Sequence, residues 1–474
     1  MFLFQQSQKN YVGESANNSE KALPYRHQGI AGRITYNYDN RYFVEGNFGY
    51  NGSENFSPNH RFGFFPSIAV GYVVSNEKFF APIRDVVSMV KLKASYGLVG
   101  NDQIGGDRRF IYNETVIGGG KYYFGTTPSQ YTSVRLGEFP NPNVGWEKAK
   151  KLNLGADLSF FNQLNISVDY FKENREGIFL QRKSIPMYVG LSTKPWVNIG
   201  KMRNSGIDAS LEYHQPLGKD LHLTVRGNFT YARNRIMDQD EPDYAYTYMN
   251  HSGQMQWQKF GLVAAGLFQD QEDIDSWAKQ SFGEVKPGDI KYLDLNGDGI
   301  VDNYDTKPIG YSDIPEIVYG FGFSLQWKAF DLSAFFQGVA HVSFSTLTDQ
   351  TQAFVGRNLK ESSVFADLYG NTWTPENPGA KYPRMTTGAI DNNNQLSTFW
   401  MANGRYLRLK NLELGYTLPK RIANKIAMQS LRVYLSGVNL FTFSPFKLWD
   451  PDLQTGATNY PNNRIINLGL TIGF

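Results

Sequence analysis

The chain has 474 residues, of which 15% are aromatic and 19% charged, and 47 basic residues against 44 acidic ones give a formal net charge of +3. This near balance gives no electrostatic argument for a nucleic-acid partner, and the absence of Cys excludes thiol catalysis, disulfide frameworks and Cys-ligated zinc. The mean hydropathy is −0.43, and no run approaches the ~18 apolar residues of a spanning helix. If the chain crosses a membrane, strands must do so.

The beginning of the chain is polar. Residues 1–10 lack the basic and apolar regions of a signal peptide, and we expect 1–28 to be the remnant of an external loop. Strands are then predicted over 29–38 and 41–50, joined at Asp39 and Asn40, a pair typical of tight turns. Further strands are predicted over 61–74 and 89–99, before a stretch rich in Gly, Asn and Tyr at 100–145.

The middle of the chain shows the clearest alternation of apolar and polar residues. Leu152, Leu154 and Leu158 alternate with polar positions such as Asp157, and after a short break the pattern resumes through Asp169. Most such runs last about ten to fourteen residues, against ~5–6 in soluble sandwiches and ~9–11 for a strand that crosses a bilayer. The length and the mid-strand carboxylates favour a membrane barrel with a wet lumen over a soluble β-sandwich.

The same reasoning gives nine further strands. Their alternating runs occupy 151–160, 164–170, 207–214, 221–231, 316–327, 330–339, 405–418, 431–441 and 463–474. The final run places Ile466, Leu468, Leu470, Ile472 and Phe474 on one face and small or polar residues on the other, which is typical of the closing strand of an outer-membrane barrel. The fold class is therefore all-β, a transmembrane antiparallel barrel, with thirteen spanning strands.

The connections fall into two classes. Those at 39–40, 161–163, 216–220 and 328–329 are short, whereas most of the alternate ones are long, including the excursion 232–315. Short periplasmic turns and long external loops are the rule for such barrels. Because thirteen is odd and single-chain bacterial barrels have even counts, we expect 29–474 to be the C-terminal part of a larger barrel.

Four motifs resemble the SusC/RagA family of TonB-dependent outer-membrane transporters. They are LKASYGLVGN at 92–101, GDIKYLDLNGDG at 288–299, RYLRLKNLELGYTLP at 405–419 and RVYLSGVNLF at 432–441, followed by the terminal Phe474. The resemblance implies a 22-stranded barrel in the bacterial outer membrane, of which this chain supplies about the last thirteen strands. It also implies an upstream plug, a TonB-contacting segment, a lid lipoprotein of the SusD type, and import of oligosaccharides or peptides rather than an enzymatic reaction.

One loop has the spacing of calcium ligands. Its candidate oxygen donors are Asp294, Asn296, Asp298, the carbonyl of Ile300, Asp302 and Asp305, with Gly299 at the sharp turn. Position twelve of the loop, Asp305, is Asp rather than Glu, and no predicted pair of helices flanks the loop. We therefore expect Ca²⁺ to stabilise the excursion 232–315 rather than to change the arrangement of helices. The alternative is a hydrogen-bonded Asx-turn loop that binds no metal.

Motifs for catalysis are absent from the sequence: it has no Gly-x-Ser-x-Gly, no His-Glu-x-x-His and no P-loop. Four tryptophans in the long loops, Trp257, Trp277, Trp373 and Trp400, are candidates for stacking on sugar rings, and packing within the loops is the alternative. Two other functions stay open: a soluble or surface-anchored all-β carbohydrate-active protein with a calcium-stapled loop, and a non-transporting barrel fragment.

Overall fold

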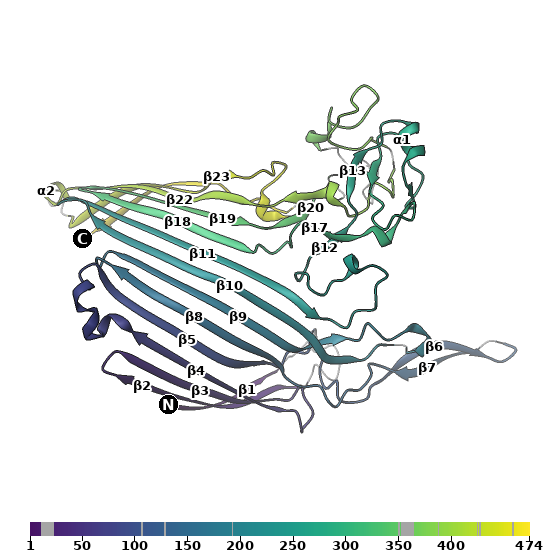
Figure 1. Ribbon diagram of the computed structural model, residues 1–474, viewed down its shortest axis with the longest axis horizontal. Helices are drawn as coiled ribbons and strands as arrows, with labels where there is room; N and C mark the ends of the chain where they lie inside the picture. Colours follow the sequence, from purple (N-terminus) through teal and green to yellow (C-terminus); the bar gives the residue numbers. More distant parts are fainter. Residues whose placement is uncertain are drawn as a thin grey trace. The chain divides into compact units, whose positions relative to one another are not determined.

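A computed structural model describes all residues except 11–22, 106–107, 128, 192, 349–350, 352–364, 387, 424, 426–427 and 457–458. Within this described part, fourteen strands form one sheet whose order follows the chain (Figure 1). They are β1 Phe2–Lys9, β2 Tyr25–Tyr38, β3 Tyr42–Ser53, β4 Phe62–Val73, β5 Val87–Asn101, β8 Glu147–Phe160, β9 Leu164–Gln181, β10 Trp196–Pro216, β11 Leu221–Asp238, β18 Ile317–Trp327, β19 Phe330–Ala340, β22 Tyr406–Thr417, β23 Ser430–Phe443 and β24 Ile465–Gly473. Among the described residues, no helix is long and apolar enough to cross a membrane.

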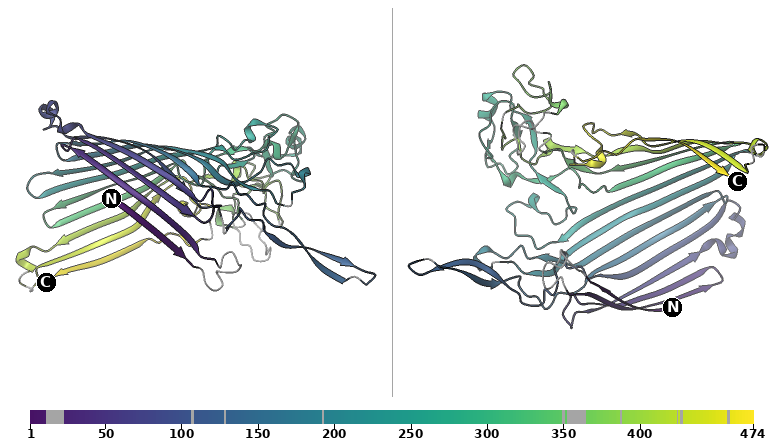
Figure 2. Two further views of the ribbon diagram at one scale, coloured as in Figure 1. Left: turned by 90° about the horizontal axis from the view of Figure 1, so that it is seen from below. Right: turned by 180° about the vertical axis from the view of Figure 1, so that it is seen from behind.

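The chain divides into two compact units. Unit 1 comprises Met1–Asn162, Ser167–Ile207 and Asn234–Asp243, and unit 2 comprises Gln163–Ile166, Asp208–Arg233 and Tyr244–Phe474. In unit 1 the strands β2 to β5 and β8 lie side by side, and in unit 2 the strands β18, β19, β22, β23 and β24 do the same (Figure 2).

Tight turns connect neighbouring strands at one end. Asp39 and Asn40, between β2 and β3, both have positive φ, at 53° and 50°. Phe161 and Asn162, between β8 and β9, have φ of 53° and 55°. Two consecutive left-handed residues are the requirement of the type I′ hairpin, whose twist matches that of the strands. The hairpins predicted at 39–40 and 161–163 are confirmed.

The two faces of the sheet differ in chemistry. Large apolar side chains stand exposed on one face, among them Ile34, Ile68, Leu92 and Leu154. On the other face of the same strands lie Lys93 and residues that pair with it across the sheet. A water-soluble protein would cover an apolar surface of this extent, whereas a membrane barrel turns it toward lipid and keeps its polar face toward the lumen.

The strand β1 corrects one prediction. Residues 1–28 were expected to be loop, but Phe2–Lys9 pairs with β2 from Phe2↔Gly32 to Lys9↔Tyr25. The described sheet therefore has fourteen strands rather than thirteen. The pattern was missed because apolar residues occur only at its start, and the run from Gln5 onward is uniformly polar and exposed.

The strands β9 and β10 are also longer than predicted, at 18 and 21 residues. Each strand extends beyond its apolar alternation, β9 after Tyr170 and β10 before Ile207. Beyond that point charged side chains pair across the strands, as when Arg175 of β9 meets Glu147 of β8 at 2.8 Å. A strand that leaves the lipid has water on both sides, so it no longer needs an apolar face.

Val225 of β11 tests the assignment of the apolar face. It lies opposite Phe323 of β18, among apolar neighbours. We expect Val225→Arg to lower the free energy of unfolding in lipid by ~2–4 kcal/mol, because a guanidinium there would face hydrocarbon. Urea titration in lipid vesicles measures the change, with Thr224→Arg on the opposite face as the matched control. Equal stability and equal heat-modifiable gel mobility in both variants would contradict the assignment.

Candidate functional site

The polar face of unit 1 carries a group of ion-paired side chains. The Lys93 ammonium of β5 lies 2.8 Å from an Asp157 oxygen of β8 and 3.3 Å from an Asp169 oxygen of β9. The Ser167 hydroxyl donates to Asp157 at 2.7 Å. These residues meet because alternate positions of adjacent strands share a face. Three strands are thereby linked by side chains as well as by backbone.

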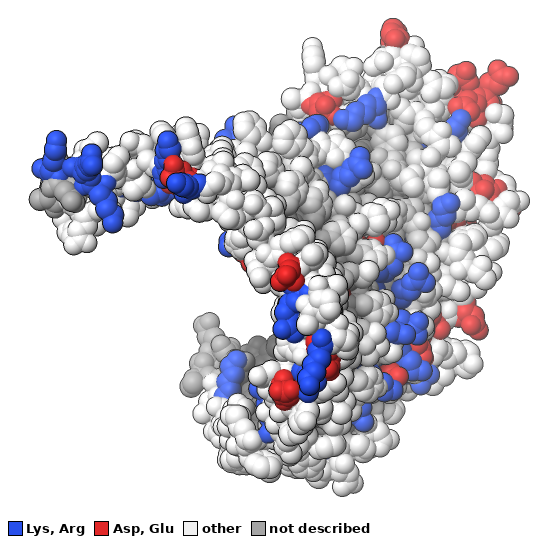
Figure 3. All heavy atoms as spheres, turned by 60° about the vertical axis from the view of Figure 1, so that its left-hand side comes forward, with Lys and Arg blue, Asp and Glu red and all other residues white. Residues whose placement is uncertain are grey.

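Unit 2 repeats this arrangement. Arg432 of β23 pairs with Asp331 of β19 and with Glu413 of β22. Arg226 of β11 lies 2.8 Å from Glu212 of β10. In Figure 3 several basic side chains lie next to acidic ones, while others stand in basic groups. The polar face is therefore rich in hydrogen-bonding groups while many of its charges are locally compensated.

A hollow of ≈ 580 Å³ lies on the polar face of unit 1. Its lining includes the small residues Ala69 and Gly71 of β4, with Glu45 of β3 on one side and Lys93 of β5 on the other. The hollow exists because β4 presents small side chains where its neighbours present long ones. A chain of polar substrate could lie against the strands at this level.

The described residues of 244–315 and 340–404, which belong to the long connections of unit 2, fold into a module with a core of its own, which we call the external module. Short strands build it: β12 Lys259–Gly261 pairs with β17 Lys307–Ile309, and β13 Ala264–Leu267 pairs with β15 Ile290–Tyr292. The core comprises Leu262, Leu267, Ile290, Tyr292, Val301, Leu368, Trp373, Tyr382 and Trp400. The segment 256–268, which contains β12 and β13, thus belongs to this module and not to the fourteen-stranded sheet.

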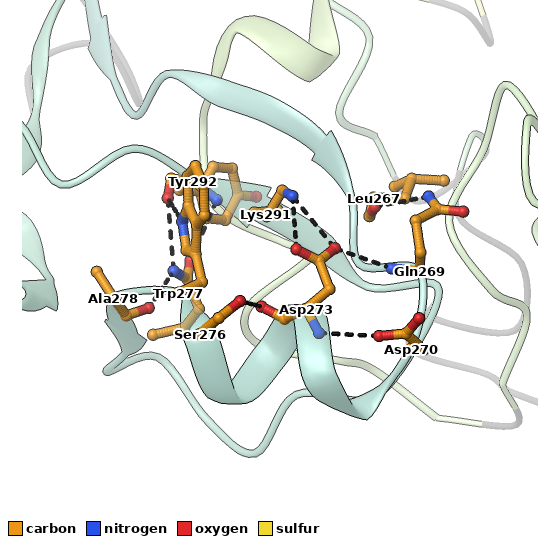
Figure 4. A network of polar contacts seen from close by, with 10 residues as sticks. Leu267, Gln269, Asp270, Asp273, Ser276, Trp277, Ala278, Lys291 and Tyr292 are labelled. Atoms are coloured by element: carbon orange, nitrogen blue, oxygen red, sulfur yellow. Dashed lines mark hydrogen bonds and ion pairs between the residues drawn. The ribbon is translucent and has the colours of Figure 1, made fainter.

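A helix turn braces one edge of this module (Figure 4). Asp270 caps α1, Gln271–Ser276, by accepting a hydrogen bond from the Asp273 backbone N–H at 2.8 Å. The Asp273 carboxylate in turn binds the Lys291 ammonium of β15 at 2.9 Å. Burial raises the pKa of Asp273, but hydrogen bonds from Lys291 and from the Gln269 backbone, together with the Lys291 charge, outweigh it and leave this pKa below its ordinary value.

The four tryptophans do not come together. Trp373 and Trp400 are only 9% and 3% exposed and pack in the core of the module. The Trp277 indole donates to the Tyr292 carbonyl at 2.7 Å, and the Lys291 ammonium lies over its ring. Trp257 is 61% exposed. Packing in the core of the module explains the positions of Trp373 and Trp400. Stacking on a sugar ring stays a prediction, and of the four tryptophans Trp257 is the one with most of its side chain exposed.

The loop predicted to bind calcium is held together by its own backbone. Asp294 accepts hydrogen bonds from Gly297 and Gly299 at 2.6 and 2.8 Å. Buried Asp305 accepts from Leu295, Asn296 and Asp302. In the part of the chain that is described, no three His, Cys, Asp or Glu side chains are grouped to hold a metal ion. These hydrogen bonds form an Asx-turn loop, and because each carboxylate keeps further lone pairs free to ligate a cation, Ca²⁺ binding by this loop stays a prediction.

Residues 5–440 match the model of the family described as TonB dependent receptor-like, beta-barrel. The chain belongs to this family. It is a SusC/RagA-like outer-membrane protein, and its relatives are receptors and transporters rather than enzymes. The predicted all-β fold, outer-membrane location and non-enzymatic character are confirmed, and the alternative of a soluble carbohydrate-active enzyme is wrong.

Individual relatives agree with this assignment. TonB-dependent receptor P3 of Formosa agariphila is 30% identical over 472 residues, covering 94% of this chain and 45% of the relative. TonB-dependent receptor SusC of Bacteroides thetaiotaomicron is 27% identical over 470 residues, covering 94% of this chain and 43% of the relative. A solved structure of the RagAB peptide transporter is similar with a TM-score of 0.74 at 22% identity, covering 95% of this chain and 48% of that chain. The chain thus spans about half the length of these relatives.

One buried group of this TonB-dependent receptor barrel was missed at the sequence level. Arg408 of β22 is almost fully buried, and its guanidinium binds Asp450 and Asp452 at 2.5 Å each. It thereby fixes the connection between β23 and β24 to the sheet. The signals available were an arginine near the start of a predicted strand and the Asp-Pro-Asp run at 450–452, but neither indicates the other without the fold.

A double substitution tests the calcium prediction. We expect the full chain to bind one Ca²⁺ fewer when Asp298→Ala and Asp302→Ala are combined, because two oxygen ligands are removed from the loop. Calorimetric titration with CaCl₂ measures the stoichiometry. Asp273→Ala, an acidic residue of the same module outside the loop, is the control. Equal stoichiometry in the double variant and the unmodified chain would exclude this loop as the site.

The lowered pKa of Asp273 predicts a pH dependence of the module. A carboxylate whose pKa falls on folding stabilises the folded state above its unfolded pKa of about 3.9, and this contribution is lost as pH falls through the folded value. We therefore expect residues 267–292 to exchange amide hydrogen faster in Asp273→Asn than in the unmodified chain at pH 6. The difference should shrink below pH 4, and comparison at equal pH cancels the intrinsic exchange rate. A difference that persists unchanged at pH 2 would contradict the role of this carboxylate.

Proposed function

We propose that this chain is the C-terminal barrel part of a SusC-like TonB-dependent importer of oligosaccharides. In this proposal the polar face of the sheet lines the path of the substrate, and the external module faces the medium. Energy comes from TonB through a region outside this chain, and a lid lipoprotein of the SusD type closes the external side.

The observation that carries the proposal is the chemistry of the polar face. Lys93, Arg226 and Arg432 each already have carboxylate partners. Such a lining offers many donors and acceptors, and these three cations are already engaged in ion pairs. It suits a neutral polyhydroxylated chain, whose hydroxyls exchange hydrogen bonds with the wall without having to separate ion pairs.

Import of peptides is the second candidate. It is favoured by the similarity of the fold to the RagAB structure, described as a peptide transporter. A peptide also carries many hydrogen-bonding groups, so the lining suits uncharged stretches of it as well. Uptake measurements on the intact protein distinguish oligosaccharides from peptides as its substrate.

The hollow over Ala69 provides the test. In the intact transporter in its native host, we expect Ala69→Trp to reduce uptake of a fluorescent oligosaccharide several-fold, because the indole would occupy the hollow on the polar face. Val70→Trp is the matched control, since its side chain lies exposed on the apolar face of the same strand. Both variants should reach the outer membrane in equal amounts on immunoblots.

The same cells distinguish the alternatives. Loss of uptake of a labelled peptide, with oligosaccharide uptake intact, would assign the transporter to peptides. Deleting TonB should abolish uptake of the true substrate. If neither the deletion of TonB nor Ala69→Trp alters the uptake of oligosaccharide or of peptide, the importer proposal fails.

A further inference from the structure

The apolar face of unit 2 ends in a row of aromatic side chains at the short-turn end of the sheet. Trp327 ends β18, Phe330 begins β19, and Tyr416 is the last residue but one of β22. The ring centroids of Trp327 and Phe330 are 6.3 Å apart, and those of Phe330 and Tyr416 are 4.7 Å apart. These pairs lie opposite one another across the strands and so share one face. Rows of this kind mark the boundary between hydrocarbon and water in membrane barrels.

Three neighbouring turns follow directly beyond this row. The Lys328 backbone N–H donates to the Asp220 carbonyl at 2.9 Å. The Thr417 backbone N–H donates to the Ala329 carbonyl at 2.8 Å. These bonds make neighbours of the turns that join β10 to β11, β18 to β19 and β22 to β23. Figure 1 shows α2, Lys420–Ala423, at the same end of β22 and β23. Because the short turns of such barrels face the periplasm, this end lies beside the inner leaflet of the outer membrane.

The side chains of the three turns are strongly basic. Their sequences, 217–220, 328–329 and 418–429, contain one acidic residue, Asp220, and five basic ones, which are Lys219, Lys328, Lys420, Arg421 and Lys425. Within the part of the chain that the structure describes, no ion pair engages any of these five cations. The turns therefore present a positive charge that the described chain does not compensate.

Lys328 places one of these charges at the membrane boundary. Its ammonium lies 5.8 Å from the centre of the Trp327 ring. Its φ is 52°, a conformation that favours Asn or Gly over Lys. The geometry of the turn therefore does not by itself account for a lysine at this position.

Unit 1 has aromatic side chains at its short turns as well, and there the chain supplies the anion. The rings of Tyr42 and Tyr72 stack at 5.1 Å. Both phenols donate to one oxygen of Glu77, at 2.6 and 3.3 Å. Arg41 pairs with the same carboxylate at 2.9 Å. In unit 2 the cations stand beside the aromatic row without such an acid, and an anion from outside the chain would complete the arrangement.

Position and charge decide the chemistry of that anion. Trp327 and Phe330 are 51% and 47% exposed on the apolar face, so the ligand must have an apolar part as well as a negative group. An anionic phospholipid has both, and Lys and Arg bind phosphate through charge-assisted hydrogen bonds. Basic clusters next to a membrane-spanning segment are typical of sites for anionic lipid headgroups. Lys420 follows Thr417 by three residues, at most about 11 Å of chain, so one headgroup is within reach of both turns.

We propose that the periplasmic end of unit 2 binds an anionic phospholipid, with its phosphate held by Lys328, Lys420 and Arg421 and its acyl chains against Trp327 and Phe330. The bound headgroup compensates the cations of these turns, as Glu77 does for Arg41 in unit 1. The inference goes beyond the proposed function, since it requires the barrel to lie in a membrane but not to transport any substrate.

The experiment measures lipid binding by the intact transporter, purified in an uncharged detergent from its native outer membrane. The probe is fluorescent phosphatidylglycerol, and fluorescent phosphatidylcholine is the comparison without net charge. We expect the combination of Lys328→Gln, Lys420→Gln and Arg421→Gln to weaken binding of phosphatidylglycerol at least tenfold, because each Lys or Arg near an anionic lipid contributes roughly a factor of five. Binding of phosphatidylcholine should be weaker from the start and unchanged by the substitutions.

The matched control removes three exposed cations from the long connections. It combines Lys121→Gln, Lys279→Gln and Lys286→Gln, and it should keep the affinity of the unmodified protein for phosphatidylglycerol. Heat-modifiable gel mobility shows whether each variant is folded.

A second variant, Ala329→Glu, keeps every cation and adds a carboxylate beside Lys328, by analogy with Glu77 in unit 1. We expect it to weaken binding of phosphatidylglycerol several-fold. If the triple variant does not fold, unchanged binding by Ala329→Glu overturns the inference on its own.

Three further results would overturn the inference. The first is equal affinity of the triple variant and its control for phosphatidylglycerol, and the second is equal affinity of the unmodified protein for the two lipids. The third is complete displacement of the lipid by millimolar glycerol 3-phosphate, which would assign the cations to a soluble phosphate ester. These measurements do not involve uptake, so the importer proposal stands or falls separately.

Discussion

The need to pair every backbone N–H and C=O group inside a membrane is the constraint on which the rest of this structure depends. A strand cannot satisfy these groups alone, so each spanning segment must lie beside its neighbours in a ladder. The described sheet follows the chain order with short turns at one end, which is the simplest way to meet this requirement. Because side chains alternate between the two faces of each strand, one face can be apolar toward lipid and the other polar toward water.

Where the chain leaves the membrane, that constraint ends and ordinary core packing takes over. The external module buries Tyr292, Trp373 and Trp400 much as a small soluble domain would. One of its edges is fixed by the ion pair between Asp273 and Lys291, and the Asp273 carboxylate also accepts a hydrogen bond from the Gln269 backbone. Arg408 fixes another connection with two carboxylates. These contacts attach the loops to the ends of the strands.

The hairpin of β6, Val116–Phe124, and β7, Ser129–Leu136, belongs neither to the fourteen-stranded sheet nor to the core of the external module. Its Tyr122, Phe124 and Tyr131 side chains are exposed. Local pairing explains the hairpin, since a Gly-rich bulge and cross-strand aromatic contacts suffice to form it.

The sequence by itself determined the fold class, the face of most strands and the tight turns, because a period of two and a pair such as Asp39 and Asn40 are local properties. It also indicated the family through short motifs. The tertiary structure decided what depends on partners distant in sequence. It showed that Phe2–Lys9 joins the sheet by pairing with β2, that Trp400 is buried rather than displayed, and that Arg408 meets Asp450. A side chain's burial and its ionic partners are set by the segments that fold against it, and no local pattern records which segments those are.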